Sequence, residues 1–448
     1  MRGVWPLTVA AVVRIGLWLV LPASRLASDE DSYVRAGTSL LTTGQQDLFW
    51  PPVTGWLIAL FGSLTPDHSI RWIRFGWLVM DLGCLAAVRV LAHRVARGVD
   101  PRDTAWSERF ANCAALAYAL YLPAISFSQF ATSEIPALLL VLLTLVFLTF
   151  DRTSTHHVLA AGVCAGLVGI TRPSLLPMLV FLPAAIVLRE RARPLWRDAA
   201  VFVAAGAVVV AAVIVRNVVS AGQLTIAHNS AYNLYIGNRD LYAEDLDLFH
   251  PVATAGQIEF RRQFFAGELT YPTQSPDELQ RDALAWIRAH PGTFARRMLG
   301  RLARVFAPKT DVLELLGGER TAGIFSASSL ALLAVTNLQW AFVLFAGLVG
   351  LAGVSRIHRR IGGLFLATVL GSLPLCLIAI AKPRYAFTFE PLLLIAALLL
   401  VFARFRLWNA LHRRDRWILA ACSLFVLWGW AAWLTFAITS RVGLASAS

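Results

Sequence analysis

Long apolar runs recur from one end of the chain to the other, and they constrain its fold more than any other feature of the sequence. Of the 448 residues, 57% are hydrophobic and 15% are charged. A soluble domain has about a quarter of its residues charged, and a helix needs about 20 consecutive apolar residues to cross a bilayer. The composition therefore excludes a soluble enzyme and predicts an all-α polytopic membrane protein.

The lengths of these runs predict about eleven transmembrane helices. They divide the chain into an N-terminal transmembrane module over 1–216, an extracytoplasmic region over 217–327 and a C-terminal transmembrane module over 328–448. The N-terminal module includes a first outer loop over 24–70. The predicted spans are 4–23, 71–92, 110–126, 134–150, 158–171, 174–188, 198–215, 328–353, 361–380, 386–403 and 417–438.

Arginines punctuate the apolar runs and indicate how the chain is oriented. The net charge is +13, from 40 basic and 27 acidic residues. In a soluble chain this excess would favour nucleic-acid binding, but cations between apolar runs point to membrane orientation, so nucleic acid is not an expected partner. With the N-terminus inside, the cytoplasmic stretches hold 18 cations and the short outer stretches hold 8. The positive-inside rule therefore predicts this orientation, in the inner or plasma membrane.

The first predicted span also has features of a secretory signal peptide, since a short basic lead precedes it and small residues lie near its end. Arg14 interrupts its apolar stretch. The alternation of the later spans between the two sides holds only if this first span stays in the protein. We therefore expect a retained helix, with cleavage as the alternative.

Parts of the predicted outer segments favour short helices. The stretch WPPVTGWLIALFG over 50–62 is too short and too marked by proline to span, so we expect it at the interface or against the bundle. A helix is predicted over 276–290, where PDELQ resembles a helix start, and it continues after Pro291.

The helix after Pro291 has an amphipathic pattern. One interpretation is a basic helix on the outer leaflet near anionic lipid headgroups, and the other is a helix that packs on its own small domain with a solvated face. The predicted apolar face holds Phe294, Leu299, Leu302 and Phe306, which leaves Arg296, Arg297, Arg301 and Arg304 elsewhere.

Ionisable side chains gather at the outer ends of the predicted spans, where they are costly unless they serve a site. Cations beside a carboxylate cluster at the headgroup level suit a lipid-borne phosphate held next to a general base. The residues are Asp29, Glu30, Asp31, Glu134, Arg172, Arg216, Asn217, Lys382 and Arg384.

These positions also have simpler structural interpretations. A solvated loop would show the same acidic cluster, and Glu134 also suits the first turn of a helix. Arg172 also suits a side chain that snorkels between two spans, and Arg216 suits an interfacial anchor. The sequence leaves these alternatives open.

Short motifs appear in a fixed order along nearly the whole chain. Together they resemble those of the bacterial relatives of protein O-mannosyltransferases and of the lipid A aminoarabinose transferase, within the C-type glycosyltransferase superfamily. The motifs are Asp29-Glu30-x-x-Tyr33 followed by Gly44, Trp50-Pro51-Pro52, Ser133-Glu134, AGLVGITRP (165–173), IVRN (214–217), NLYIGN (233–238), WIRAHPGTFARRM (286–298) and KPRYAFTFEP (382–391).

This resemblance implies a hexosyl- or pentosyltransferase that moves a single sugar from a polyprenyl-phosphate donor to an acceptor hydroxyl on the extracytoplasmic face, with inversion. It implies that Asp29 acts as general base or positions the acceptor hydroxyl, with Glu30 as its neighbour in the motif. The available ligands for the donor phosphate are Arg172, Arg216, Lys382 and Arg384, and the other candidate site residues are Asp31, Tyr33, Glu134, Asn217, Asn238 and Tyr385.

The chain departs from the family pattern in two places. The aminoarabinose branch carries a basic residue before the motif tyrosine and a lysine before the Pro-Pro pair, where this chain has Ser32 and Trp50. That branch's donor binding therefore does not carry over. The large lumenal domain of the protein O-mannosyltransferases has no visible counterpart.

Inverting transfer needs a carboxylate to deprotonate the acceptor and cations to stabilise the leaving phosphate. Because arginine and lysine can take the place of a divalent metal, no obligatory metal is expected, although three adjacent acids leave a divalent cation open. The five cysteines lie in apolar runs without a CxxC pattern, so neither a disulfide framework nor a zinc site is expected.

Two other classes of function remain. A transporter or flippase of polyprenyl-linked sugars would also use outer cations and many spans, but transporters keep polar residues near the bilayer midplane and often show inverted repeats. Here Asp81 is the only acid near the midplane, and no repeat is visible. A membrane subunit without chemistry is the third class. The sugar, the acceptor, which is a lipid, glycan or protein, and the oligomeric state stay open.

Overall fold

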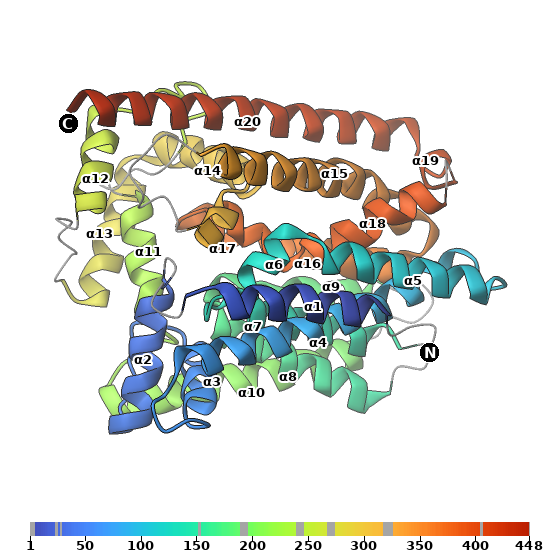
Figure 1. Ribbon diagram of the computed structural model, residues 1–448, viewed down its shortest axis with the longest axis horizontal. Coiled ribbons are helices and arrows are strands. Elements are labelled where there is room, and N and C mark those ends of the chain that lie inside the picture. The colour runs from blue at the N-terminus through green and yellow to red at the C-terminus, as the bar shows by residue number, and fades with distance from the viewer. Residues whose placement is uncertain are drawn as a thin grey trace. The chain divides into compact units, whose positions relative to one another are not determined.

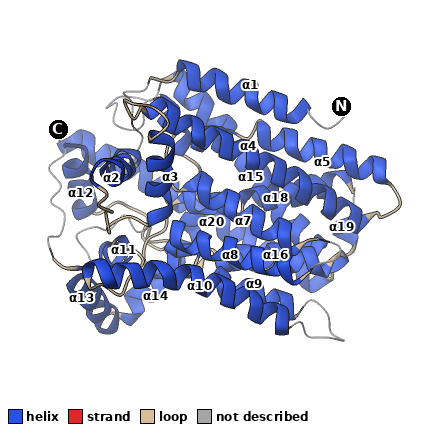
Figure 2. Ribbon diagram, turned by 90° about the horizontal axis from the view of Figure 1, so that it is seen from below, coloured by secondary structure: helices blue, strands red, loops and turns tan. Residues whose placement is uncertain are grey.

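The structure is a computed structural model that describes residues 5–22, 26, 29–150, 154–188, 196–238, 246–266, 274–316, 326–403 and 406–447, without the side chains of 261, 264–266 and 441–447. These residues form α-helices and short 3-10 helices, with no strand among them (Figure 2). The all-α fold class predicted from the sequence is confirmed for this part of the chain. Within the predicted extracytoplasmic region, 239–245, 267–273 and 317–325 lie outside the described residues.

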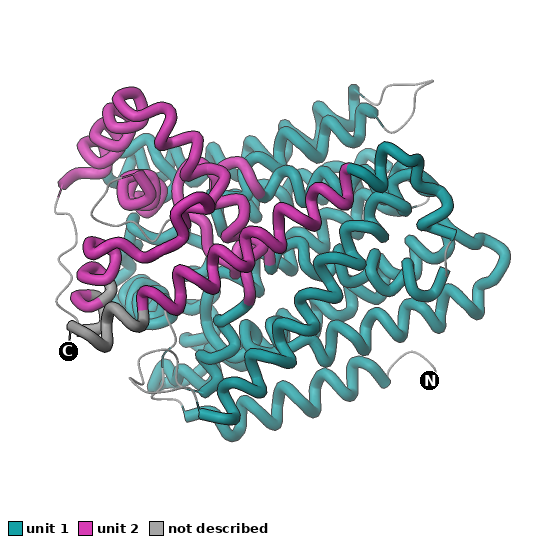
Figure 3. The backbone as a smooth tube through the Cα atoms, turned by 90° about the horizontal axis from the view of Figure 1, so that it is seen from above, with its two compact units in different colours: residues 1–227, 309–372, 387–417 teal, residues 228–308, 373–386, 418–448 magenta. Residues whose placement is uncertain are grey.

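The chain divides into two compact units, shown in two colours in Figure 3. Unit 1 comprises 1–227, 309–372 and 387–417, and unit 2 comprises 228–308, 373–386 and 418–448. Each unit joins segments that are far apart in the sequence. The grouping therefore cuts across the three consecutive segments expected from the sequence.

Unit 1 holds most of the helices, and Figure 1 labels its α-helices. They are α1 (Trp5–Val20), α2 (Glu30–Thr43), α3 (Pro52–Gly62), α4 (Ile70–Val99), α5 (Thr104–Ala119), α6 (Leu122–Phe127), α7 (Glu134–Leu148), α8 (Thr155–Thr171), η1 (Pro173–Leu175), α9 (Met178–Val187), α10 (Trp196–Ala221), η3 (Asp311–Leu316), α15 (Ala327–Ile357), α16 (Arg359–Gly371), α18 (Glu390–Phe402) and α19 (Arg406–Asn409).

Unit 2 is built from shorter helices. They are α11 (Asn229–Asn238), α12 (Ala255–Ala266), α13 (Pro276–Ala289), α14 (Pro291–Val305) and α17 (Pro374–Ile378). Two further elements contribute residues to both units: η4 (Pro383–Thr388) and α20 (Arg413–Ala447).

Five helices in the described part of the chain are long and apolar enough to cross a membrane, at Ile70–Val99, Trp196–Ala221, Ala327–Ile357, Arg359–Ile378 and Arg413–Ser440. Every predicted span overlaps a described helix, and the span count of eleven stays a prediction. The predicted spans 110–126 and 361–380 each contain two α-helices. Pro123 lies in the first turn of α6, after α5 has ended, and Pro374 begins α17 after α16, because proline is favoured in the first turn of a helix and disfavoured in its interior.

Helices α8 and α10 pack closely because glycines line their contact. A Cβ atom on Gly162 would lie 2.4 Å from the carbonyl oxygen of Phe202, and one on Gly166 would lie 2.6 Å from that of Gly206. Small residues let helix backbones approach in this way. The contacts advance in the same direction along both helices, so α8 and α10 run parallel. Arg172, directly after α8, and Arg216, in the last turns of α10, therefore lie toward the same end of this helix pair.

In unit 2 the sequence correctly predicted a capped helix. Ser275 caps α13 by accepting the backbone N–H of Glu278, and the Glu278 side chain accepts the backbone N–H of Ser275 in return. This capping box is the local signal that starts the helix.

The predicted faces of α14 need a correction. Arg301, expected away from the packed face, is fully buried, whereas Leu299 is 44% exposed. The buried side instead holds Gly300, Arg301, Ala303 and Val305. The reason is that α14 packs through small residues. A Cβ on Gly300 would lie 1.8 Å from the carbonyl oxygen of Leu246, and Ala303 belongs to a core cluster with Phe436.

Candidate active site

The first candidate residue, Asp29, lies at the start of α2. It is the N-cap residue, and its backbone carbonyl accepts the N–H of Tyr33 at 3.1 Å. Its side chain makes no capping hydrogen bond to the helix. The helix ends at Gly44, whose φ of 72° is a left-handed conformation that glycine adopts without strain. The Asp29 carboxylate is thus held on a helix terminus but is not used in capping it.

Glu30, the neighbour of Asp29, is fully buried and held by a network of its own. Its two carboxylate oxygens accept hydrogen bonds from Arg74 of α4, Nε to Oε1 at 2.9 Å and Nη2 to Oε2 at 2.8 Å. Oε1 also accepts the backbone N–H of Ala131 at 2.8 Å. These charge-assisted hydrogen bonds hold the carboxylate of Glu30 between α2, α4 and the segment before α7. Glu30 therefore fits a positioning role better than that of a base.

Tyr33 joins α2 to the segment before α7. Its side chain is 5% exposed, shares a hydrogen bond with Ser133, and packs against Trp50 with ring centroids 4.4 Å apart. Burial raises the pKa of Tyr33 well above its usual value, and the nearby carboxylates of Asp29 and Glu134 raise it further. The phenol therefore stays protonated and can donate a hydrogen bond.

Glu134 and Arg172 form a buried ion pair between the start of α7 and the end of α8. Arg172 Nη1 lies 2.9 Å from Glu134 Oε1, and the two side chains are 8% and 3% exposed. The carboxylate of Glu134 thus contacts a cation, in addition to lying in the first turn of its helix. Arg172 points into the protein, which does not fit the snorkelling alternative.

These contacts bring the acids of α2 and α7 together around Tyr33. The charges of Asp29, Glu134 and Arg172 all act on its phenol. Unit 1 thus places a carboxylate at a helix terminus beside a neutral phenol and a buried Glu–Arg pair. Such a group of side chains can accept a proton, donate a hydrogen bond and keep a cation close to a developing negative charge.

Arg216 and Asn217 lie on α10, close to the first outer loop. The Arg216 guanidinium donates to Gln46 and lies 5.8 Å from the ring centroid of Trp56. Asn217 is fully buried and donates to the carbonyl oxygens of Thr225 at 2.7 Å and Ile226 at 3.1 Å. Asn217 therefore fixes the chain after α10, while Arg216 lies along the aromatic surface of the loop.

Four candidate residues belong to unit 2. Lys382, Arg384 and Tyr385 lie on or beside the turn η4 and are half-buried. Asn238 is fully buried and ends α11. The four expected phosphate ligands are therefore divided, with Arg172 and Arg216 in unit 1 and Lys382 and Arg384 in unit 2.

Asp31, the third acid of the cluster, differs from the buried Glu30 because its side chain is partly exposed. Its side chain is 44% exposed and pairs with Arg35, one turn further along α2. An exposed pair of this kind fits a solvated helix surface. Asp31 therefore has the environment that the loop alternative described.

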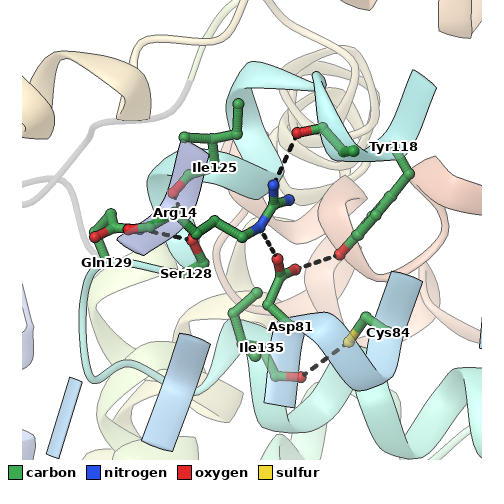
Figure 4. Close-up of polar contacts among 9 residues, drawn as sticks. Arg14, Asp81, Cys84, Tyr118, Ile125, Ser128, Gln129 and Ile135 are labelled. Atoms are coloured by element: carbon green, nitrogen blue, oxygen red, sulfur yellow. Dashed lines mark hydrogen bonds and ion pairs between the residues drawn. The ribbon is translucent and has the colours of Figure 1, made fainter. Parts of the chain in front are cut away.

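A polar network around Asp81 was not assigned to the site from the sequence. Asp81 of α4 and Arg14 of α1 form an ion pair that is 0% exposed on both sides. Tyr118 donates to Asp81 Oδ1 at 2.6 Å, and Arg14 Nη1 donates to the carbonyl oxygen of Ala119 at 2.8 Å, as Figure 4 shows. The only signal in the sequence was that a charge interrupts each apolar run.

A second buried cluster surrounds Glu390. Lys309 Nζ lies 2.5 Å from Glu390 Oε1, and Tyr121 donates to Oε2 at 2.7 Å. The Lys309 ammonium also lies 4.3 Å from the ring centroid of Trp340. The sequence alone does not mark Lys309 as a site residue, because nothing local to it indicates the carboxylate that it meets.

Metal and disulfide chemistry have few candidate residues in the described part of the chain. No group of three or more His, Cys, Asp or Glu side chains comes together there. The three acids at the start of α2 separate, because Glu30 turns to Arg74 and Asp31 turns to Arg35. All five cysteines have free thiols.

Comparisons with known proteins give structural neighbours only. No family model and no curated protein matches the sequence. The oligosaccharyltransferase AglB from Archaeoglobus fulgidus, solved with an inhibitory peptide and a dolichol-phosphate, is 14% identical, with a TM-score of 0.47 over 99% of this chain and 56% of that one. Its apo form has 15% identity and a TM-score of 0.49 over the same shares, 99% and 56%. ArnT from Cupriavidus metallidurans, bound to undecaprenyl phosphate, has 16% identity and a TM-score of 0.41 over 88% of this chain and 78% of that one.

This chain spans 56% of the length of the archaeal enzyme.

Proposed function

We propose that this protein is a membrane glycosyltransferase that moves one sugar from a polyprenyl-phosphate donor to an acceptor hydroxyl on the extracytoplasmic face, with inversion. The observation that carries the proposal is the start of α2. There Asp29 lies beside the protonated phenol of Tyr33, while the adjacent Glu30 is bound by Arg74. The order of the sequence motifs supports the class of enzyme and of donor.

Asp29 is the residue that fits the general base. In the reaction, its carboxylate accepts the proton of the acceptor hydroxyl while that oxygen attacks the anomeric carbon of the sugar. The bond from this carbon to the phosphate oxygen breaks, and polyprenyl phosphate leaves with the electron pair. Because attack and departure take place on opposite sides of the carbon, the configuration inverts.

Three acids near Asp29 form ion pairs. Glu30 holds Arg74, Glu134 holds Arg172 and Asp31 holds Arg35. The buried pairs give Glu30 and Glu134 structural roles, because each holds an arginine from a distant part of the chain.

Cations have the second role, because the leaving phosphate gains negative charge. Arg172 contributes a positive charge close to Tyr33, and its ion pair with Glu134 holds the guanidinium in place. The proposed partners in this role are Arg216, Lys382 and Arg384. Charge-assisted hydrogen bonds from arginine and lysine to phosphate are among the strongest that proteins make.

The test starts from the cell envelope. Mass spectrometry of glycans and glycoproteins with and without the gene identifies the sugar and the acceptor. The purified protein in lipid nanodiscs is then assayed for release of polyprenyl phosphate and for sugar on the acceptor.

Asp29→Asn should lower turnover by about a hundred- to ten-thousandfold, the usual effect of losing a general base, with donor binding kept. Asp31→Asn is the matched control on the same turn and should keep near-normal turnover. A protein that carries the intact donor across reconstituted vesicles without releasing polyprenyl phosphate would instead be a transporter.

A further inference from the structure

Unit 2 contains an arginine whose side chain is completely buried. Arg301 of α14 is 0% exposed. Its Nη1 donates to the carbonyl oxygens of Leu377 at 3.0 Å and Ile378 at 2.8 Å. Its Nη2 donates to the carbonyl oxygen of Gly237 and to Asn238 Oδ1, the latter at 3.2 Å. One guanidinium thus contacts the ends of two other helices.

The acceptors of Arg301 explain why a charge is buried here. Gly237 and Asn238 end α11, and Leu377 and Ile378 end α17. The last carbonyl groups of a helix have no partner within it and carry partial negative charge. A planar guanidinium with five N–H donors can satisfy several of them at once, which the single ammonium of lysine cannot do in the same geometry.

Two further contacts hold the same point of the chain. Asn238 Nδ2 donates to the carbonyl oxygens of Leu234 at 2.7 Å and Ile378 at 3.1 Å. Gly237 also lies close to Ala379, the residue after Ile378. A Cβ on Gly237 would be 1.9 Å from the carbonyl oxygen of Ala379. Residues 377–379 are therefore fixed against α11 and α14 before the chain enters the turn η4.

This turn carries the cations Lys382 and Arg384. Only Ile380 and Ala381 separate the fixed segment from Lys382, so the anchor at 377–379 limits where the turn lies. We infer that Arg301 is a positioning residue that sets the placement of Lys382 and Arg384 for the phosphate group of the lipid donor. The inference rests on the proposed function, since it assigns these cations to the donor phosphate.

The same contacts link three parts of the sequence that are far apart along the chain. The segment over 233–238 supplies Gly237 and Asn238, the helix that begins at Pro291 supplies Arg301, and the segment over 382–391 carries the cations. Arg301 therefore connects the segment over 233–238 to residues 377–379, which lie just before the segment over 382–391.

The experiment uses the full-length protein in nanodiscs and polyprenyl phosphate alone as the probe. Arg301→Lys keeps the charge but loses the fork of donors. We expect the affinity for polyprenyl phosphate to fall about tenfold or more, because misplaced cations make weaker charge-assisted contacts to the phosphate, and loss of one such contact costs about ten- to a hundredfold in affinity. Arg296→Lys is the matched control, because Arg296 lies on the same helix and is exposed. It should leave the affinity unchanged.

A double-mutant cycle separates positioning from general loss of structure. In a Lys382→Ala/Arg384→Ala background, Arg301→Lys should weaken binding no further, because the cations that it positions are absent. Asn238→Ala, which removes the second contact to Ile378, should act in the same direction and serves if Arg301→Lys folds poorly.

The outcomes distinguish this inference from the proposed function. A wild-type protein that does not bind polyprenyl phosphate would contradict the proposed function. The inference about Arg301 is wrong if the wild type binds polyprenyl phosphate and both Arg301→Lys and Asn238→Ala bind it with the wild-type affinity. The inference is also wrong if the effect of Arg301→Lys is the same with and without Lys382 and Arg384.

Discussion

The buried pair of Glu30 and Arg74 gives a prediction that separates fold from chemistry in a single motif. Glu30→Gln removes the negative charge and leaves the Arg74 guanidinium, with its side chain 4% exposed, without its bidentate partner. Breaking a buried ion pair by removing one member costs about 3–5 kcal/mol. We therefore expect Glu30→Gln to lower the stability of unit 1 by this amount, whereas Asp29→Asn, one residue earlier, lowers turnover without a comparable loss of stability.

The measurement is the unfolding midpoint of the purified variants in one detergent, followed by the intrinsic fluorescence of tryptophan. The control is Asp31→Asn, which breaks the exposed pair with Arg35, where the side chains are 44% and 70% exposed. Such a pair contributes about 0.3–0.5 kcal/mol, so this variant should unfold close to the wild type.

A compensated variant tests the cause of the loss. Glu30→Gln combined with Arg74→Met removes the unpaired charge, and replacing both members of a buried pair by neutral groups is often close to neutral. The double variant should therefore recover much of the stability. The reasoning is refuted if Glu30→Gln has the same unfolding midpoint as the wild type but a lower turnover, because Glu30 would then take part in the reaction.

Two further predictions concern other charges. Asp81→Asn leaves the fully buried Arg14 without its carboxylate and should destabilise the protein by about 3–5 kcal/mol, measured by the same unfolding assay, with an unchanged midpoint as the contradicting result. Hydrogen bonds from the Ser275 backbone N–H and side chain lower the pKa of Glu278, so its contribution to the start of α13 is present above its usual pKa and lost as pH falls through the lowered value. Hydrogen exchange of the first turn of α13, corrected for its intrinsic pH dependence, should therefore accelerate below that pH in the wild type and show no such step in Glu278→Gln.

Much of the local structure follows from short patterns. The apolar runs correspond to helices because their residues recur at helical spacing and the backbone satisfies itself within each helix. The start of α13 is encoded within four residues, by Ser275 and Glu278. The motif that places Asp29 and Tyr33 on one turn is also local, since the two residues are four apart in the chain.

The partners of the charged side chains are different, because they depend on which helices pack together. Glu30 and Arg74 are 44 residues apart, and Tyr121 and Glu390 are 269 residues apart. No nearest-neighbour pattern identifies a carboxylate that will be bound by a distant arginine. For this reason the sequence does not show that Glu30 is bound by Arg74.

Arg301 shows the same limit most clearly. Its spacing on α14 indicated a polar face, because an arginine is usually exposed unless it has partners. The tertiary structure brings the ends of α11 and α17 to it, and their unpaired carbonyl groups make burial of the charge favourable. The sequence by itself therefore determined where helices form and where ionisable residues stand along them. Only the packing of distant helices decided which charges are paired, which are buried and which lie beside the residues proposed for catalysis.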